Sequence, residues 1–212
     1  AKYVLECKSR EDILQAIEFI KKNAIKKIFV LGLGSNLIFT DDYFDGAVIL
    51  ITKERGKTEV TIDQDGYVEA FAGEILDTVI TFSFENNLVG LEWAGGLPGT
   101  VGGEIRGNAG AFKGEIKDNV LEVRSLDIKS LEEKIRSNSE CNFGYRNSIF
   151  KSGIGENEFI TSVVLRLTED DKEEIKQKIQ QKIDYRINRH PMDYPNIGST
   201  FKNIPLTSLS SN

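Results

Sequence analysis

The stretch GLPGTVGGEIRGNAGAF, residues 96–112, belongs to the most glycine-rich part of the sequence. Nine of the chain's 19 glycines fall between Gly90 and Gly114. Glycine loses more conformational freedom on folding than any other residue, so such a run is unfavourable to order. A backbone without Cβ atoms either turns sharply or allows another group to approach it closely. The run therefore predicts a tight turn or a ligand-binding loop.

A second glycine-rich segment, LGLGSN at residues 31–36, directly follows the apolar run Ile28–Leu31. It lacks the third glycine of a dinucleotide fingerprint, because Ser35 and Asn36 follow Gly34. Backbone N–H groups in such a turn can still form an anion-binding nest. Taken alone, the segment fits a plain strand-ending turn equally well. Two glycine-rich loops together can hold a diphosphate from two sides, and the alternative is that both merely turn tightly.

Composition excludes several classes of partner. The chain has 212 residues, enough for one large or two small domains, and its net charge of −6 argues against a nucleic-acid partner. No apolar run approaches the ~18–20 residues that a membrane-spanning helix needs. Cys7 and Cys141 form no CxxC pair, which is typical of a reducing compartment. We therefore expect a cytoplasmic protein without a membrane partner, and the sequence leaves its oligomeric state open.

His190 is the only histidine, and it precedes Pro191 at the end of a charged segment. A Ser-His-Asp triad is therefore improbable, and without a His or Cys cluster we expect no zinc or other metal site. The chemistry must come from a cofactor or from Ser, Arg, Lys, Tyr and carboxylate side chains.

The N-terminal part has the pattern of a small α/β unit, residues 1–46. Residues 3–6 and the apolar run at positions 28–31 predict strands. Between them Ser9 is a helix cap, and Ile13, Ile17 and Ile20 recur at helical spacing over residues 10–23. Short β-rich runs then fill a larger mixed unit, residues 47–168, interrupted by one helix at 75–86.

A strongly charged helix is predicted over residues 169–190. Ile175, Ile179, Ile183 and Ile187 recur every four residues and predict one apolar stripe. The helix leads into a third segment that runs to residue 212, in which NIGSTFKNI, residues 196–204, reads as a turn into a strand. The fold class is α+β.

Four segments resemble successive motifs of the UDP-N-acetylenolpyruvoylglucosamine reductase family. In chain order they are LGLGSNLIFTDDYFDGAVI (31–49), GLEWAGGLPGTVGGEIRGNAGAFKGEI (90–116), CNFGYRNSIFK (141–151) and PNIGSTFKN (195–203). The resemblance covers roughly residues 1–205. The four motifs in this order are far more specific than any one alone.

The resemblance implies an FAD-binding fold of the vanillyl-alcohol-oxidase type, in the family's shorter subtype. Units 1–46 and 47–168 would then be two FAD-binding subdomains, and residues 169–212 a connecting helix and a partial substrate domain. The FAD-binding residues that it implies are Gly32, Gly34, Ser35, Asn36 and Leu37 in one loop, Pro98, Gly99, Thr100, Gly102 and Gly103 around the diphosphate, and Asn108, Ala109 and Gly110 near the flavin.

The implied activity is reduction of UDP-N-acetylglucosamine enolpyruvate to UDP-N-acetylmuramate with NADPH, in peptidoglycan synthesis. Reducing an enolpyruvyl ether needs a hydride, supplied by flavin that NADPH has reduced, and a proton. By resemblance Arg146 is the cation that stabilises the developing charge, and Ser199 is the proton donor. Without the motifs, a surface ion pair for Arg146 and a turn for Ser199 would be the commoner roles.

Three further residues are implied to contact the UDP-sugar substrate: Lys202, Asn203 and Tyr145, the last of which either lines the pocket or simply packs. Glu104 stands where the family usually has a small residue. Beside a diphosphate its carboxylate would be repulsive, so we expect it to point away or to weaken binding.

Family members normally have a segment before the point that matches Ala1 and continue well past FKN, including a glutamate that helps protonation. The resemblance therefore implies a chain truncated at both ends. Two alternatives to the reductase stay open: a non-catalytic or impaired flavin- or nucleotide-binding fragment, and another oxidoreductase with the same fold. The GYRNS and GSTFKN motifs favour the reductase over the second alternative.

Overall fold

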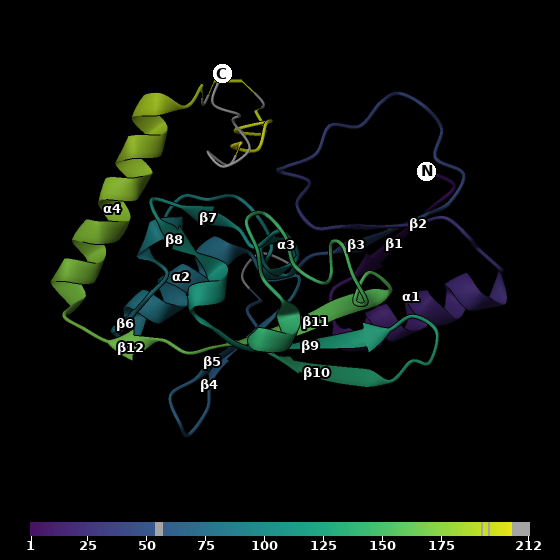
Figure 1. Ribbon diagram of the computed structural model, residues 1–212, viewed down its shortest axis with the longest axis horizontal. Coiled ribbons are helices and arrows are strands. Elements are labelled where there is room, and N and C mark those ends of the chain that lie inside the picture. The colour runs from purple at the N-terminus through teal and green to yellow at the C-terminus, as the bar shows by residue number, and fades with distance from the viewer. Residues whose placement is uncertain (54–56, 192, 195, 205–212) are drawn as a thin grey trace, which may run out of the picture.

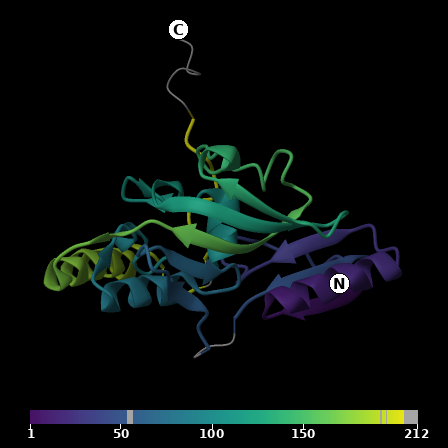
Figure 2. The same cartoon turned by 90° about the horizontal axis from the view of Figure 1, so that it is seen from below.

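The computed structural model describes residues 1–53, 57–191, 193–194 and 196–204 and arranges them as two lobes side by side (Figure 1). The N-terminal lobe contains a three-stranded sheet, and the larger lobe contains a five-stranded sheet. Helices α1 and α4 lie at opposite ends of the molecule, as Figure 2 also shows.

The N-terminal lobe is a parallel sheet covered by one helix. Its strands are β1 (Tyr3–Cys7), β2 (Ile28–Leu31) and β3 (Ala47–Ile51), in the order β1-β3-β2. Helix α1 (Arg10–Lys22) begins after Ser9, whose hydroxyl accepts the Asp12 N–H at 3.1 Å. The predicted isoleucines of α1 are all buried against the sheet. The helical period and the cap thus identified α1 correctly.

The expected boundary at residue 46 separates β3 from both of its partners. Because β3 pairs in parallel with β1 on one side and β2 on the other, it is the central strand of the small sheet. A connection between parallel strands needs a crossover, so the chain returns to this sheet after a long loop. We propose that the first unit ends after Ile51.

The larger lobe is built on an antiparallel sheet of order β10-β9-β11-β5-β4. The long central strands β9 (Val120–Asp127) and β11 (Glu158–Leu165) are flanked by β10 (Glu133–Ser137), β5 (Val68–Phe71) and β4 (Val60–Ile62). Val123, Leu126 and Val163 are fully buried in its core. Helix α3 (Val101–Gly107) packs against β5 and β11, which places the glycine-rich stretch on this sheet.

Shorter elements complete this lobe. Helix α2 (Leu76–Glu85) confirms the one helix that is predicted within this unit, at residues 75–86. Two small antiparallel pairs join β6 (Leu88–Val89) to β12 (Thr168–Glu169), and β7 (Gly110–Ala111) to β8 (Gly114–Glu115). Turns of 3-10 helix lie at Glu92–Ala94, Ile116–Asp118 and Ser139–Cys141.

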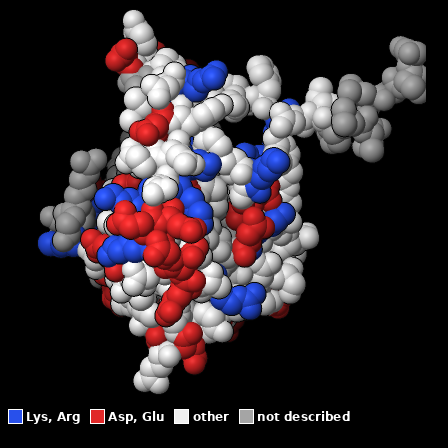
Figure 3. Space-filling view, turned by 90° about the vertical axis from the view of Figure 1, so that its left-hand side faces the viewer, with Lys and Arg blue, Asp and Glu red and all other residues white. Residues whose placement is uncertain are grey.

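Helix α4 (Lys172–Arg189) differs from its predicted apolar stripe. Ile175 is buried, but Ile187 is 57% exposed. A four-residue step advances 400° around a helix of 3.6 residues per turn, so each step drifts by about 40° and the stripe leaves the interface by the fourth isoleucine. Arg186 is buried in its place. Acidic and basic side chains gather on the end of the molecule that α4 forms (Figure 3).

Two further outcomes concern the last part of the chain. Residues 196–204 form no strand, so the prediction of a strand there is wrong. Pro195 and the segment from Pro205 onward lie outside the described residues. No helix within the described ranges is long and apolar enough to cross a membrane.

Candidate functional site

The two glycine-rich loops lie against each other across the junction of the lobes. The Ser35 hydroxyl donates a hydrogen bond to the Pro98 carbonyl at 2.9 Å. A Cβ atom added to Gly32 would lie only 2.2 Å from Oγ1 of Thr100, so no other residue fits at Gly32 without a shift. The first loop leaves the end of β2, and the second enters α3. The structure therefore brings together segments more than 60 residues apart in the sequence.

Several glycines of the second loop are explained by packing of the chain on itself. A Cβ on Gly102 would lie 3.0 Å from Cβ of Ala72, and the Gly102 N–H already donates to the Ala72 carbonyl at 2.8 Å. A Cβ on Gly110 would lie 2.8 Å from the Gly114 carbonyl. Part of the glycine content therefore serves close packing of this lobe, whichever ligand binds.

Other positions in the two loops are open. A Cβ on Gly103 would meet only Thr100 Oγ1 at 3.4 Å, and Gly34 has φ +72° with only a Leu31 methyl group within 4 Å. Within the described part of the chain, nothing accepts a hydrogen bond from the backbone N–H groups of Ser35, Asn36 or Gly103. Free N–H donors without obstructing side chains fit an anionic diphosphate.

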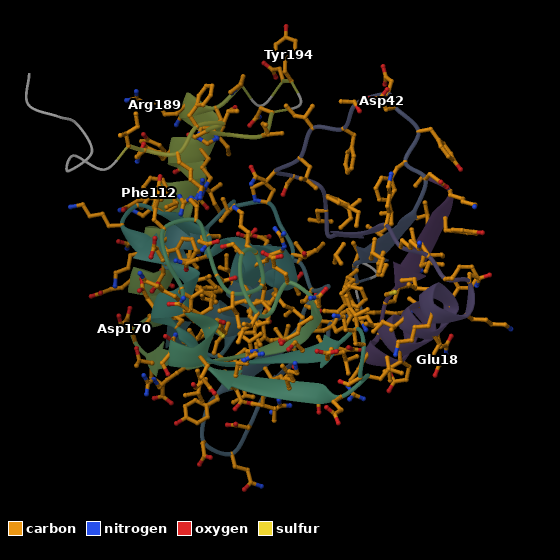
Figure 4. All side chains as sticks on the ribbon, turned by 45° about the vertical axis from the view of Figure 1, so that its right-hand side comes forward. Glu18, Asp42, Phe112, Asp170, Arg189 and Tyr194 are labelled. Carbon is orange, nitrogen blue, oxygen red and sulfur yellow. The ribbon has the colours of Figure 1, made fainter. Side chains whose placement is uncertain are left out.

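Leu37 follows the first loop, and its N–H donates to the Gly34 carbonyl at 3.2 Å. Its side chain is exposed, as are those of Ile38 and Phe39 beside it. These residues begin the long segment that leads to β3 and carries Asp42 at its outer edge (Figure 4).

Glu104 lies beneath the loop instead of pointing outward. Its side chain is packed against Gly99, where a Cβ atom would overlap the carboxylate, and the residue is only 9% exposed. Burial raises the pKa of Glu104 to about 7, although the charges of Arg146 and Arg186 oppose the rise. None of the hydrogen bonds between described residues involves this carboxylate, so the charges of Arg146 and Arg186 are what oppose the effect of burial.

Asn108 ends α3 in a left-handed conformation, with φ +44°. Its side chain is completely buried and is used within the protein: Nδ2 donates to the Gly144 carbonyl at 2.9 Å and to Glu115 at 3.2 Å, and Oδ1 accepts from the Lys117 N–H at 3.3 Å. The Ala109 N–H donates to the Glu104 carbonyl. Asn108 thus fixes the end of the glycine-rich stretch next to the segment that carries Arg146.

Arg146 lies at the tip of a tight turn. Gly144 and Asn147 exchange backbone hydrogen bonds at 2.9 and 3.1 Å, which leaves Tyr145 and Arg146 as the two turn residues. The guanidinium donates to the Gly110 carbonyl at 2.5 Å and to the Asn108 carbonyl at 3.5 Å, and it stacks on the Tyr145 ring at 5.2 Å. The predicted cation therefore lies directly beside the predicted flavin segment.

The last described segment approaches the same turn. The Asn203 N–H donates to the Tyr145 hydroxyl at 3.4 Å. Burial lowers the pKa of the Lys151 amine, and the positive charge of Lys202 lowers it further. Ser199 is exposed, and its side chain makes no hydrogen bond with any described residue. The structure thus brings Tyr145, Lys202 and Asn203 together, and it shows no hydrogen bond between Ser199 and Arg146.

Sequence reasoning missed Arg186, which ties α4 to the glycine-rich stretch. Its guanidinium donates to the Gly95 carbonyl at 2.8 Å and to the Trp93 carbonyl at 3.4 Å, and it lies 5.2 Å from the Phe112 ring. Phe112 also meets Tyr185 edge-on at 5.1 Å, and Figure 4 shows it beside α4. The sequence offers one signal for this role: Arg186 directly precedes Ile187, the isoleucine of the predicted stripe that is exposed in the structure.

Among the described residues no group of three or more His, Cys, Asp or Glu side chains could hold a metal ion. The described part of the site therefore consists of backbone amides, hydroxyls, one buried carboxylate and several cations.

Similar proteins match this fold and these motifs. The chain is 37% identical over 203 residues to the UDP-N-acetylenolpyruvoylglucosamine reductase of Carboxydothermus hydrogenoformans, covering 96% of this chain and 65% of that protein. It is 34% identical to the enzyme of the same name from Lactobacillus helveticus, again covering 65% of it. The chain thus spans slightly less than two thirds of the length of these relatives. The resemblance seen in the four motifs is confirmed.

Comparison with solved structures gives the same family likeness. The chain superposes on UDP-N-acetylenolpyruvylglucosamine reductase from Thermus caldophilus with a TM-score of 0.75 at 29% identity, covering 95% of this chain and 68% of that one. A cholesterol oxidase mutant from Brevibacterium sterolicum, at 15% identity and a TM-score of 0.54, shares the fold alone. The expected flavin fold is therefore confirmed. Residues 1–130 match the FAD binding domain family, and the chain belongs to that family.

Proposed function

We propose that this chain holds FAD between its two glycine-rich loops, as part of a reductase that converts UDP-N-acetylglucosamine enolpyruvate to UDP-N-acetylmuramate with NADPH. One observation carries the proposal: loop 32–36 contacts loop 98–103, and the Arg146 guanidinium lies on Gly110 at the end of the same stretch. A diphosphate site and a fixed cation therefore lie along one surface. The names of the similar proteins support this reading.

The residues fit FAD. The unpaired N–H groups of Ser35, Asn36 and Gly103 would hold the diphosphate, and the Asn108–Gly110 backbone would lie beside the flavin. When bound and reduced by NADPH, FAD supplies the hydride. The pairing of the loops by Ser35 and Thr100 holds the donors in place before the ligand arrives, which reduces the ordering that binding requires.

Arg146 would bind the substrate carboxylate. Hydride addition to the enolpyruvyl double bond places negative charge on the carbon beside that carboxylate, and a guanidinium with two parallel donors stabilises it. The hydrogen bonds from Arg146 to Gly110 and Asn108 fix its plane in advance. Ser199 would then deliver the proton to this carbon once the substrate draws residues 196–204 inward.

Tyr145, Lys202 and Asn203 would contact the UDP part of this small-molecule substrate, and the reaction would take place in the cytoplasm. The alternative function is flavin binding without turnover. It is favoured by the exposed position of Ser199, whose hydroxyl makes no hydrogen bond with any described residue.

The test separates the two half-reactions. We expect purified protein to take up FAD with the absorbance bands of oxidised flavin, to be bleached by NADPH and to be reoxidised by the enolpyruvyl substrate. Arg146→Ala should slow reoxidation by about 10²–10³-fold, as loss of a charge-stabilising donor does, and leave bleaching by NADPH unchanged. The exposed Arg166→Ala is the control. A protein that takes up no FAD would overturn the proposal, and uptake without reoxidation would establish the alternative.

A further inference from the structure

Lys151 is a half-buried lysine that neither the sequence motifs nor the proposed mechanism assigns a role. Its Nζ donates a hydrogen bond to the Arg146 carbonyl at 3.0 Å. Burial, followed by the charges of Lys202, Arg106 and Arg146, lowers the pKa of Lys151. The described residues form no ion pair with Lys151. A half-buried ammonium group among other positive charges costs free energy, so its presence suggests that its hydrogen bond or its charge has a function.

The Arg146 backbone needs support. Its φ of +56° lies in the left-handed region, which glycine and asparagine adopt readily and arginine adopts only at a cost of about 1–2 kcal/mol. The turn hydrogen bonds use the N–H and C=O groups of Gly144 and Asn147, and leave the Arg146 carbonyl free. Lys151 supplies a donor to that carbonyl from five residues further along the chain.

The turn is held against the glycine-rich stretch from both sides. Ser148 is completely buried and donates to the Arg106 carbonyl at 2.8 Å, while Asn108 donates to the Gly144 carbonyl. These two bonds fix the base of the turn. The bond from Lys151 is the one that reaches the strained residue at its tip.

We propose that Lys151 is a positioning residue for Arg146: its ammonium group holds the Arg146 main chain in the left-handed conformation, and thereby keeps the guanidinium over Gly110. The proposal rests on the proposed function for its catalytic consequence only. Lys151 does not need to touch the substrate. Its positive charge also adds to those of Arg106, Arg146 and Lys202, so the surface around the turn favours an anionic ligand such as a carboxylate or diphosphate.

Two variants separate the roles of length, charge and hydrogen bonding. Lys151→Met keeps the length and apolar body of the side chain but removes the donor, and Lys151→Arg restores a charged donor. Lys129→Met removes one exposed charge far along the chain and is the matched control. We expect Lys151→Met to bind FAD and to be bleached by NADPH at the normal rate, and to be reoxidised by the enolpyruvyl substrate about 10-fold or more slowly. Lys151→Arg should recover part of that rate.

A double-mutant cycle then identifies the route of the effect. If Lys151 acts through Arg146, Lys151→Met should have no further effect on reoxidation in the Arg146→Ala protein, since contacting residues couple and independent ones add. An equal loss in both backgrounds would overturn the positioning role.

A second readout does not depend on activity. The Nε–Hε NMR signal of Arg146, assigned by its loss in Arg146→Ala, should have the order parameter of a fixed side chain in the normal protein and fall below about 0.6 in Lys151→Met. An unchanged order parameter would overturn the proposal, even if turnover fell. A fall in order, in a protein that the substrate does not reoxidise, would support the positioning role and refute the proposed function.

Discussion

Glu104 is a residue of the candidate site whose acidity is strongly altered by the fold. Its pKa rises from the usual 4.5 to about 7 because burial disfavours the charged form. A carboxyl group with a raised pKa binds more protons in the folded than in the unfolded protein. The folded state is therefore penalised as the pH rises from about 4.5 to 7, and the penalty is constant above that range.

The first prediction concerns the pH dependence of stability. At 1.36 kcal/mol per pKa unit, the penalty from Glu104 reaches about 3 kcal/mol above pH 7. Glu104→Gln removes the charge and keeps the shape, so the variant should gain stability relative to the normal protein as the pH rises from 5 to 8. Urea unfolding across this range measures it, with the exposed Glu85→Gln as control. Parallel pH profiles for normal protein and variant would show that Glu104 titrates normally.

The second prediction concerns Ser199. NADPH reduction of flavin needs no proton from Ser199, and one hydroxyl is a small part of substrate binding. Ser199→Ala should therefore retain both, while single-turnover reoxidation slows by about 10²–10⁴-fold, the usual effect of losing a general acid. Ser199→Cys should keep partial activity because a thiol also delivers a proton. Normal reoxidation in Ser199→Ala would leave Ser199 as a turn residue.

Some residues of the candidate site can be predicted from a local sequence motif, and others only from the tertiary structure. Arg146 was found because GYRNS is a local pattern, and the structure places it beside Gly110. Lys151 lies in the longer motif CNFGYRNSIFK, but its role depends on the conformation of a turn, which the residue type alone does not reveal. Arg186 was missed because its partner, Gly95, lies 91 residues away and accepts through its backbone.

At the level of elements, the hydrophobic period identified those whose burial is one-sided. Helix α1 was predicted correctly for this reason. The strand Ile28–Leu31 was predicted correctly from its continuous apolar run, although its side chains are half-buried or exposed. Helix α3 was not predicted as a helix, because glycines disfavour one. Tertiary hydrogen bonds from Val101 and Gly102 to the carbonyls of Glu74 and Ala72 fix its first turn. Packing overrides intrinsic preference here.

The third prediction concerns how α4 docks. Arg186→Ala removes two hydrogen bonds from a buried charged group, and each such bond contributes about 1.5–3 kcal/mol. We expect a loss of about 2–3 kcal/mol in the free energy of unfolding, measured by urea denaturation. Ile187→Ala, one position later but exposed, should change it by less than about 0.5 kcal/mol. The reverse order of effects would mean that the isoleucine stripe, and not Arg186, anchors the helix.

Across the whole molecule, polar contacts join the two lobes. Besides the bond from Ser35 to Pro98, Lys21 donates to the Lys129 carbonyl at 2.7 Å and Arg10 pairs with Glu133 at 3.2 Å. Arg10 and Glu133 are exposed enough for water to screen their pairing, which therefore contributes little to stability. A ligand held by both glycine loops would add a further connection between the lobes.

The last prediction follows from that bridging position. A ligand that binds only the folded protein stabilises it by mass action, about 2.7 kcal/mol at 100 times its Kd. FAD should therefore raise the melting temperature of both lobes together in circular dichroism. Gly103→Val should abolish this rise, because a branched side chain at this position in the first turn of α3 would fill the open space that the diphosphate needs. It should melt normally without FAD, since valine disfavours a helix no more than glycine does. Gly107→Val, in the same helix with open space around it, should keep the FAD-induced rise. If Gly103→Val were stabilised as strongly as the normal protein, FAD would bind elsewhere.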